Sequence, residues 1–118
     1  NGLMLFTNAS IPEIAVQGGS LTNNPFYDVE ISGGKVYWAA NPYILNNCKL
    51  NGTQFAGSSG YMHVEGICEN VSNDYNESNT STNANHYFGT FVLSGGTIEL
   101  TAMEITVGSF RNTGGTVS

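Results

Sequence analysis

The chain is short of charged residues, and above all of basic ones. Only 10% of its 118 residues are Asp, Glu, Lys or Arg, whereas about a quarter is typical of globular domains. Its basic residues are Lys35, Lys49 and Arg111. Proteins bind nucleic acids by placing several Lys or Arg side chains against phosphates, so this composition excludes DNA and RNA as partners. It also disfavours binding to an anionic membrane surface.

Long apolar runs are missing as well. No stretch approaches the roughly 20 apolar residues of a membrane helix, so we expect no membrane span. The chain is nevertheless expected to fold, because 11% of its residues are aromatic and 40% are hydrophobic, whereas disordered chains combine few aromatics with high charge. Its length predicts one domain.

Helix signals are also scarce, since no segment combines a 3.6-residue apolar period with capping residues. Instead, short apolar and alternating runs are separated by Gly-Gly pairs, which predict strands joined by tight turns. Each pair is followed by a small polar residue or lysine and then an aliphatic residue. The four copies are Gly18-Gly19-Ser20-Leu21, Gly33-Gly34-Lys35-Val36, Gly95-Gly96-Thr97-Ile98 and Gly114-Gly115-Thr116-Val117.

Two all-β architectures are compatible with this pattern. The first is an antiparallel β-sandwich, Ig-like or jelly-roll-like, in which the Gly-Gly pairs close hairpins. The alternative is a β-solenoid, in which they mark a structural repeat. The copies begin at Gly18, Gly33, Gly95 and Gly114, and no single period divides the intervals between them. We therefore predict the sandwich.

The domain organisation follows from the distribution of apolar residues. Residues 1–17 form an N-terminal apolar arm, and residues 18–118 form the sandwich domain, with a long polar loop at 69–85. The arm begins with four apolar residues, which suit a strand covered on both faces. We expect this strand either to be donated to a neighbouring subunit or to pair within its own domain. Its residues are Leu3, Met4, Leu5 and Phe6.

The two cysteines, Cys48 and Cys68, predict one disulfide and an oxidising compartment. The alternative is a pair of buried free thiols. Binding a metal through cysteine needs more ligands at closer spacing, so we expect no metal site and no cofactor.

Glycosylation sequons agree with an oxidising, extracellular location, which we expect to be the surface of a cell or virion. Five Asn-X-Ser/Thr triplets are present, and three of them lie in the polar region between residues 70 and 81. The candidate acceptors are Asn8, Asn51, Asn70, Asn76 and Asn79.

Aromatic residues in the middle of the chain are candidates for stacking on sugars or for anchoring an interface. The alternative is that they pack in the core or simply favour strands. They are Tyr37, Trp38, Tyr43 and Tyr61. Catalysis is not expected, because the Gly57-Ser58-Ser59-Gly60 segment lacks the spacing of a nucleophile elbow and the two histidines, His63 and His86, are expected to be structural.

These observations favour a structural role. We expect an extracellular, N-glycosylated subunit of a self-assembling filament, pilus-like fibre or other surface assembly, whose partners are copies of itself. Strand donation between subunits is the predicted mechanism. The alternative is a carbohydrate-binding or adhesive module, or a viral fibre or capsid-decoration domain.

Overall fold

The structure of the chain is a computed structural model. It describes residues 2–7, 14–16, 25–32, 35–38, 42–51, 54–57, 62–72, 74–76, 84–100 and 103–118. Within these ranges the regular structure is β-strand and contains no helix, so the all-β part of the prediction is confirmed.

The strands form two sheets, which we call sheet A and sheet B. Sheet A contains β1 (Leu3–Thr7), β3 (Asp28–Ser32), β5 (Tyr43–Ile44), β6 (Cys48–Asn51), β8 (His63–Asn70), β10 (Ala84–Leu93) and β12 (Met103–Asn112). Sheet B contains β2 (Ile14–Val16), β4 (Lys35–Trp38), β7 (Gln54–Gly57), β9 (Asp74–Asn76), β11 (Thr97–Glu99) and β13 (Thr116–Val117).

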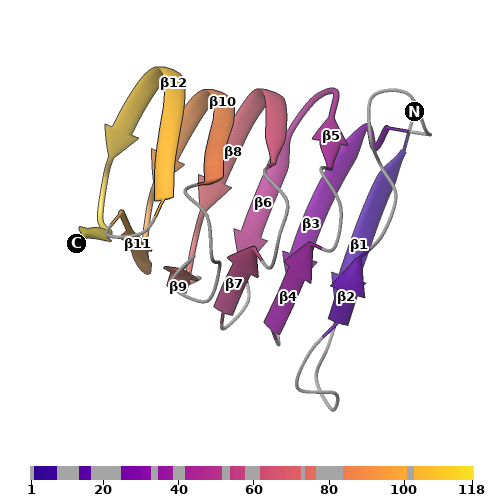
Figure 1. Cartoon of the computed structure of the whole chain (residues 1–118), viewed down its shortest axis with the longest axis horizontal. Coiled ribbons are helices and arrows are strands. Elements are labelled where there is room, and N and C mark those ends of the chain that lie inside the picture. Colours follow the sequence, from indigo (N-terminus) through magenta and orange to yellow (C-terminus); the bar gives the residue numbers. More distant parts are fainter. Residues whose placement is uncertain are drawn as a thin grey trace.

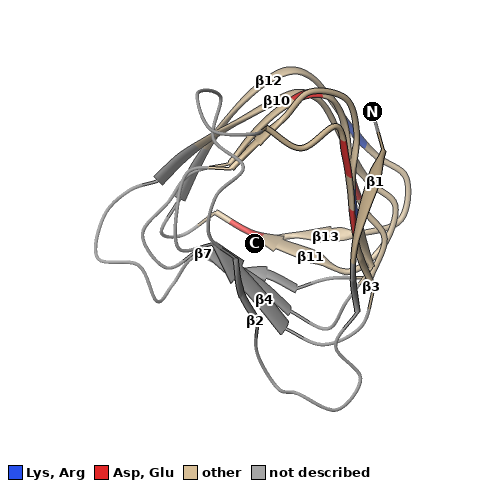
Figure 2. Ribbon diagram, turned by 90° about the vertical axis from the view of Figure 1, so that its right-hand side faces the viewer, with Lys and Arg blue, Asp and Glu red and all other residues tan. Residues whose placement is uncertain are grey.

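The chain alternates between the two sheets, and each circuit forms one rung of a solenoid. The described residues form six rungs, which succeed one another from the N-terminus to the C-terminus (Figure 1). Figure 2 looks along this stack and shows β11 and β13 across the interior from β10 and β12. Because each rung contacts its sequence neighbours, the architecture is nearly one-dimensional.

The predicted antiparallel sandwich is wrong, because every pairing between the described strands is parallel. The pair Gly33-Gly34 follows β3 of sheet A and precedes β4 of sheet B. Gly95-Gly96 likewise separates β10 from β11. The described pair, Gly95-Gly96, therefore lies at a corner between the sheets and does not close a hairpin, and the chain also changes sheet between Ser32 and Lys35. Gly96 has a φ of 68°, a conformation that glycine adopts without steric cost.

Strand register arranges the core in columns that run along the stack. One column, which we call the central core column, enters every rung of sheet A. Its members are Met4, Val29, Cys48, Cys68, Phe91 and Phe110. The four middle members are buried. Apart from the buried Val92, the residues on either side of them along the strands are exposed or half-buried, which is the alternation expected for a sheet with one covered face.

Unequal rungs hide the structural repeat in the sequence. Ile31 pairs with Leu50, Leu50 with Asn70, and Asn70 with Leu93. The sequence separations of these paired residues differ from one another. Their sum equals the long interval between the second and third Gly-Gly pairs. The next pairing, of Leu93 with Asn112, fills the short interval between the third and fourth pairs. The repeat is therefore real, but its rungs vary in length.

Sheet A bends along the length of its middle rungs. In one rung the bend separates β5 from β6, and both of these strands pair with β8. In the next pairing the register shifts between Phe88 and Thr90, at Gly89. The bend divides the outer face of sheet A into two parts, and each part carries a distinct set of exposed side chains.

Candidate functional site

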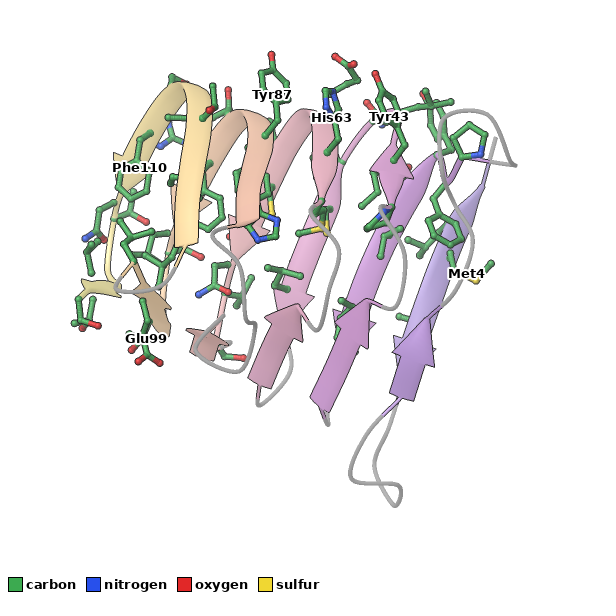
Figure 3. All side chains as sticks on the ribbon, viewed as in Figure 1. Met4, Tyr43, His63, Tyr87, Glu99 and Phe110 are labelled. Carbon is green, nitrogen blue, oxygen red and sulfur yellow. The ribbon has the colours of Figure 1, made fainter. Side chains whose placement is uncertain are left out.

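The first part of the outer face carries a row of stacked rings, which we call the aromatic ladder: Tyr43, His63 and Tyr87. These residues occupy matched register positions on β5, β8 and β10. The ring centroids of Tyr43 and His63 are 4.3 Å apart, and those of His63 and Tyr87 are 4.4 Å apart. All three side chains point away from the ribbon along one edge of the molecule (Figure 3). Each ring therefore covers a face of its neighbour and leaves its edge exposed.

Glu65 binds two members of the ladder through one carboxylate oxygen. Its Oε1 accepts a hydrogen bond from the Tyr43 hydroxyl and lies 2.9 Å from His63 Nε2. These hydrogen bonds lower the pKa of Glu65, and the one from Tyr43 has the larger effect. The same bond to the carboxylate raises the pKa of Tyr43. The arrangement thus favours a neutral phenol beside an ionised carboxylate.

This network is expected to stabilise the fold over a defined pH window. The Glu65 contribution is present above the pKa of an unfolded carboxyl group and is lost as the pH falls through the lowered folded value. The Tyr43 contribution is present below the unfolded phenol value of about 10 and is lost as the pH rises through the raised folded value. Both groups are near the surface, so solvent screening keeps the total effect small.

Replacing Glu65 with Gln is expected to lower the pKa of Tyr43 toward its ordinary value. The variant keeps a hydrogen-bond acceptor but removes the negative charge that opposes phenolate formation. An NMR titration of the Tyr43 ring measures the change. Glu30→Gln is the matched control, because Glu30 lies on another strand of the same sheet and should leave the Tyr43 titration unchanged. An identical Tyr43 titration in wild type and Glu65→Gln would contradict this network.

The second part of the outer face holds an open groove with a volume of about 370 Å³. Its walls combine apolar side chains with charged ones: Leu3, Ile67, Asp28, Glu30, Lys49 and Glu69. Three of these residues form a charged row, because Glu30 pairs with Lys49 and Lys49 with Glu69. Opposite charges therefore face each other on adjacent rungs, which stabilises the sheet modestly.

Side-chain oxygens next to the groove accept hydrogen bonds from another side chain and from backbone N–H groups. The Asn46 amide Nδ2 and the Asn47 backbone N–H both donate to Asp28 Oδ1, at 2.9 and 3.0 Å. The Ile67 backbone N–H donates to Asn47 Oδ1 at 2.9 Å. These bonds satisfy backbone donors at the bend, where the ladder of the sheet is interrupted. They link three successive rungs next to the groove.

The two cysteines lie beside each other in the core. Cys48 on β6 pairs in register with Cys68 on β8, and both are buried free thiols. Burial, together with the neighbouring Cys48, raises the pKa of the Cys68 thiol well above its ordinary value. Burial therefore favours the protonated form of the Cys68 thiol. Neighbouring positions on adjacent strands are within the Cα separation of disulfides, and the disulfide stays a prediction.

The predicted assembly strand is the first strand of sheet A. Residues Leu3 to Phe6 pair in parallel with Asp28 to Ile31 of the same chain. Leu3, Met4 and Leu5 remain exposed. β1 therefore lies at an edge of sheet A, and β2 pairs with β4 in sheet B, so residues of the predicted arm form the first rung.

The four predicted aromatics do not form one cluster. Tyr37 and Trp38 lie on β4 of sheet B, whereas Tyr43 lies on β5 of sheet A. Tyr61 lies outside the described residues. Sequence reasoning missed the association of Tyr43 with Tyr87, because it becomes visible only when rungs of different length are aligned.

The two histidines have different environments. His63 joins the aromatic ladder on the outer face. His86 is buried and accepts a hydrogen bond from the Met62 N–H at 2.8 Å. They lie on opposite sides of sheet A and do not share a site.

The candidate glycosylation sites differ in accessibility. Asn51 ends β6 at a corner, is half-buried, and accepts a hydrogen bond from the Ser72 hydroxyl. Asn70 is fully buried and its Nδ2 donates to the Gly95 carbonyl, which argues against a glycan on this nitrogen in the folded chain. Asn76 lies on β9. Asn8 and Asn79 are outside the described residues.

Comparison with known proteins assigns the chain to no family. No family model matches it, and neither does any curated protein or solved structure. Among the described residues, no three His, Cys, Asp or Glu side chains are grouped so as to hold a metal ion. The described part of the chain also contains no helix with the length and apolarity needed to cross a membrane.

Proposed function

We propose that the chain is a structural segment of a stiff β-solenoid rod at the surface of a cell or virion. The observation that carries this proposal is the continuity of the columns: the same register positions are stacked from the first rung to the last. Such a stack resists bending because each rung is held by the backbone hydrogen bonds of two parallel sheets. This geometry suits a rod that spaces or supports other molecules.

The composition supports an exterior location for the rod. A surface with three basic residues among 118 is covered largely by Asn, Ser, Thr and Gly. The sequons at Asn51 and at residues outside the described ranges supply candidate positions for N-glycans. The buried, in-register cysteines are compatible with a disulfide that an oxidising compartment would allow.

Immunogold electron microscopy of the natural material tests this role. Antibodies raised against the folded chain are expected to label the shaft of a fibre, stalk or surface layer. Labelling confined to a diffuse soluble fraction would contradict the structural role.

A second candidate function is binding of carbohydrate by the outer face of sheet A. The groove favours it, because its volume of about 370 Å³ lies within the range of small-molecule sites and its walls offer both hydrogen-bonding and apolar groups. Glycan-array binding that is lost in Lys49→Ala but kept in Arg111→Ala would support this function. Absence of glycan binding by the wild-type chain would exclude this second function.

A further inference from the structure

Both ends of the stack expose side chains that are interior elsewhere. Phe110 is 40% exposed, whereas Phe91, its neighbour in the central core column, is fully buried. At the other end of the same column Met4 is 44% exposed. Figure 3 shows Met4 and Phe110 at opposite ends of the molecule. Among the described strands, β1 pairs with β3 and β12 pairs with β10, so each has one open edge.

We propose that a second copy of the chain docks head to tail on these ends, with its β1 beside β12 and its β2 beside β13. This inference rests on the proposed structural role and names the partner. In the second copy, β1 runs in the same direction as β12, so the parallel register of sheet A continues without a break. Sheet B continues in the same way from β13 to β2.

The register columns make the two ends complementary. Continuing the central core column places Met4 of the second copy against Phe110, a favourable contact between a thioether and an aromatic ring. The equivalent column of sheet B runs from Ile14 to Val117 through every rung. Its continuation places the position of Ile14 next to Val117, which is 46% exposed. Apolar positions therefore meet apolar positions in both sheets.

The charged side chains also permit this contact. The outer column that contains the charged row begins with Leu5 and ends with Val92 and Arg111. Continuing it places Leu5 of the second copy beside Arg111, whose aliphatic stem packs on apolar groups while its guanidinium stays in water. These columns bring no like charges together across the contact. The two surfaces differ, so the contact is heterologous, and because each copy is displaced along the stacking axis the contact repeats without closing and produces a fibre.

The axial repeat of such a fibre follows from the rung spacing. Parallel strands lie about 4.8 Å apart, so six rungs give about 29 Å for each copy. This value is a second readout that is independent of the mutations below.

Mixing two end-blocked variants tests the proposal. Wild type is expected to show a mass that rises with concentration in sedimentation analysis. Met4→Asp blocks one end and Phe110→Asp blocks the other, so each variant alone should be monomeric. An equimolar mixture should form a dimer and stop there, because the intact C-terminal end of Met4→Asp accepts the intact N-terminal end of Phe110→Asp.

A control variant and two possible results decide whether the proposed contact is correct. Leu45→Asp changes an exposed apolar side chain on a middle rung, away from both ends, and should assemble like wild type, with circular dichroism showing that all three variants are folded. A wild-type chain that stays monomeric at every concentration would overturn the proposal, and so would self-association of Phe110→Asp alone. If labelling still follows a fibre shaft, such a result leaves the rod intact and shows that further rungs of a longer chain, or another protein, cover these ends.

Discussion

Replacing Phe91 with Ala is expected to lower the free energy of unfolding by about 3–5 kcal/mol. Phe91 is fully buried, and its ring lies 4.9 Å from that of Phe88 and 5.7 Å from that of Phe110, measured between centroids. Its removal leaves a cavity between two rungs that are already fixed by backbone hydrogen bonds, so the site collapses little. Urea unfolding followed by far-ultraviolet circular dichroism measures the loss.

Phe110→Ala is the matched control for this prediction. It makes the same chemical change one rung further along the same column, but its ring is 40% exposed. We expect a loss of about 1–2 kcal/mol, because less apolar surface is removed from the interior. Phe91→Leu provides a smaller perturbation if Phe91→Ala does not fold. Equal losses at Phe91 and Phe110 would contradict the burial gradient along the column.

Local patterns predicted the strands but not how they pair. Short apolar and alternating runs predict strands, and Val29 and Ile31, which alternate with polar residues along β3, are both in the core. A Gly-Gly pair predicts that the chain turns. The pair does not specify whether the next strand returns along the same sheet or crosses to the other one. Between Ser32 and Lys35 the chain crosses from β3 of sheet A to β4 of sheet B, and this choice depends on packing of the whole stack.

The candidate site was less predictable because it depends on register. Tyr43, His63 and Tyr87 lie far apart in the chain, and nothing local relates them. The interval from Tyr43 to His63 equals that between the two paired cysteines. The interval from His63 to Tyr87 differs from the one that β8 and β10 follow beyond the Gly89 bend, because the register shifts there. Only a repeat analysis that allows such shifts at corners and bends would have brought these rings together.

Replacing Gly89 with Ala is expected to destabilise the fold by about 3 kcal/mol, at the upper end of typical overpacking effects. A Cβ at this position would collide with the carbonyl oxygen of Glu65 and lie 2.9 Å from that of Gly66. Both contacts are with backbone, which cannot rotate away as a side chain can. The same crowding recurs on the next rung, where a Cβ on Gly108 would lie 2.6 Å from the Gly89 carbonyl oxygen. Glycine is thus required for close approach of the rungs at the bend.

Gly2→Ala supplies the control, because no atom lies within 4 Å of its added Cβ, and we expect a change below about 0.5 kcal/mol. Urea unfolding compares the two variants, and similar losses would contradict the steric argument. The Tyr43 titration adds a test of the link to the outer face. Gly89 packs against the backbone of Glu65, whose side chain holds Tyr43 and His63. Moving that backbone should weaken the hydrogen bond to Tyr43 and shift its pKa in the same direction as Glu65→Gln, so the bend both permits the stacking of rungs and positions the aromatic ladder.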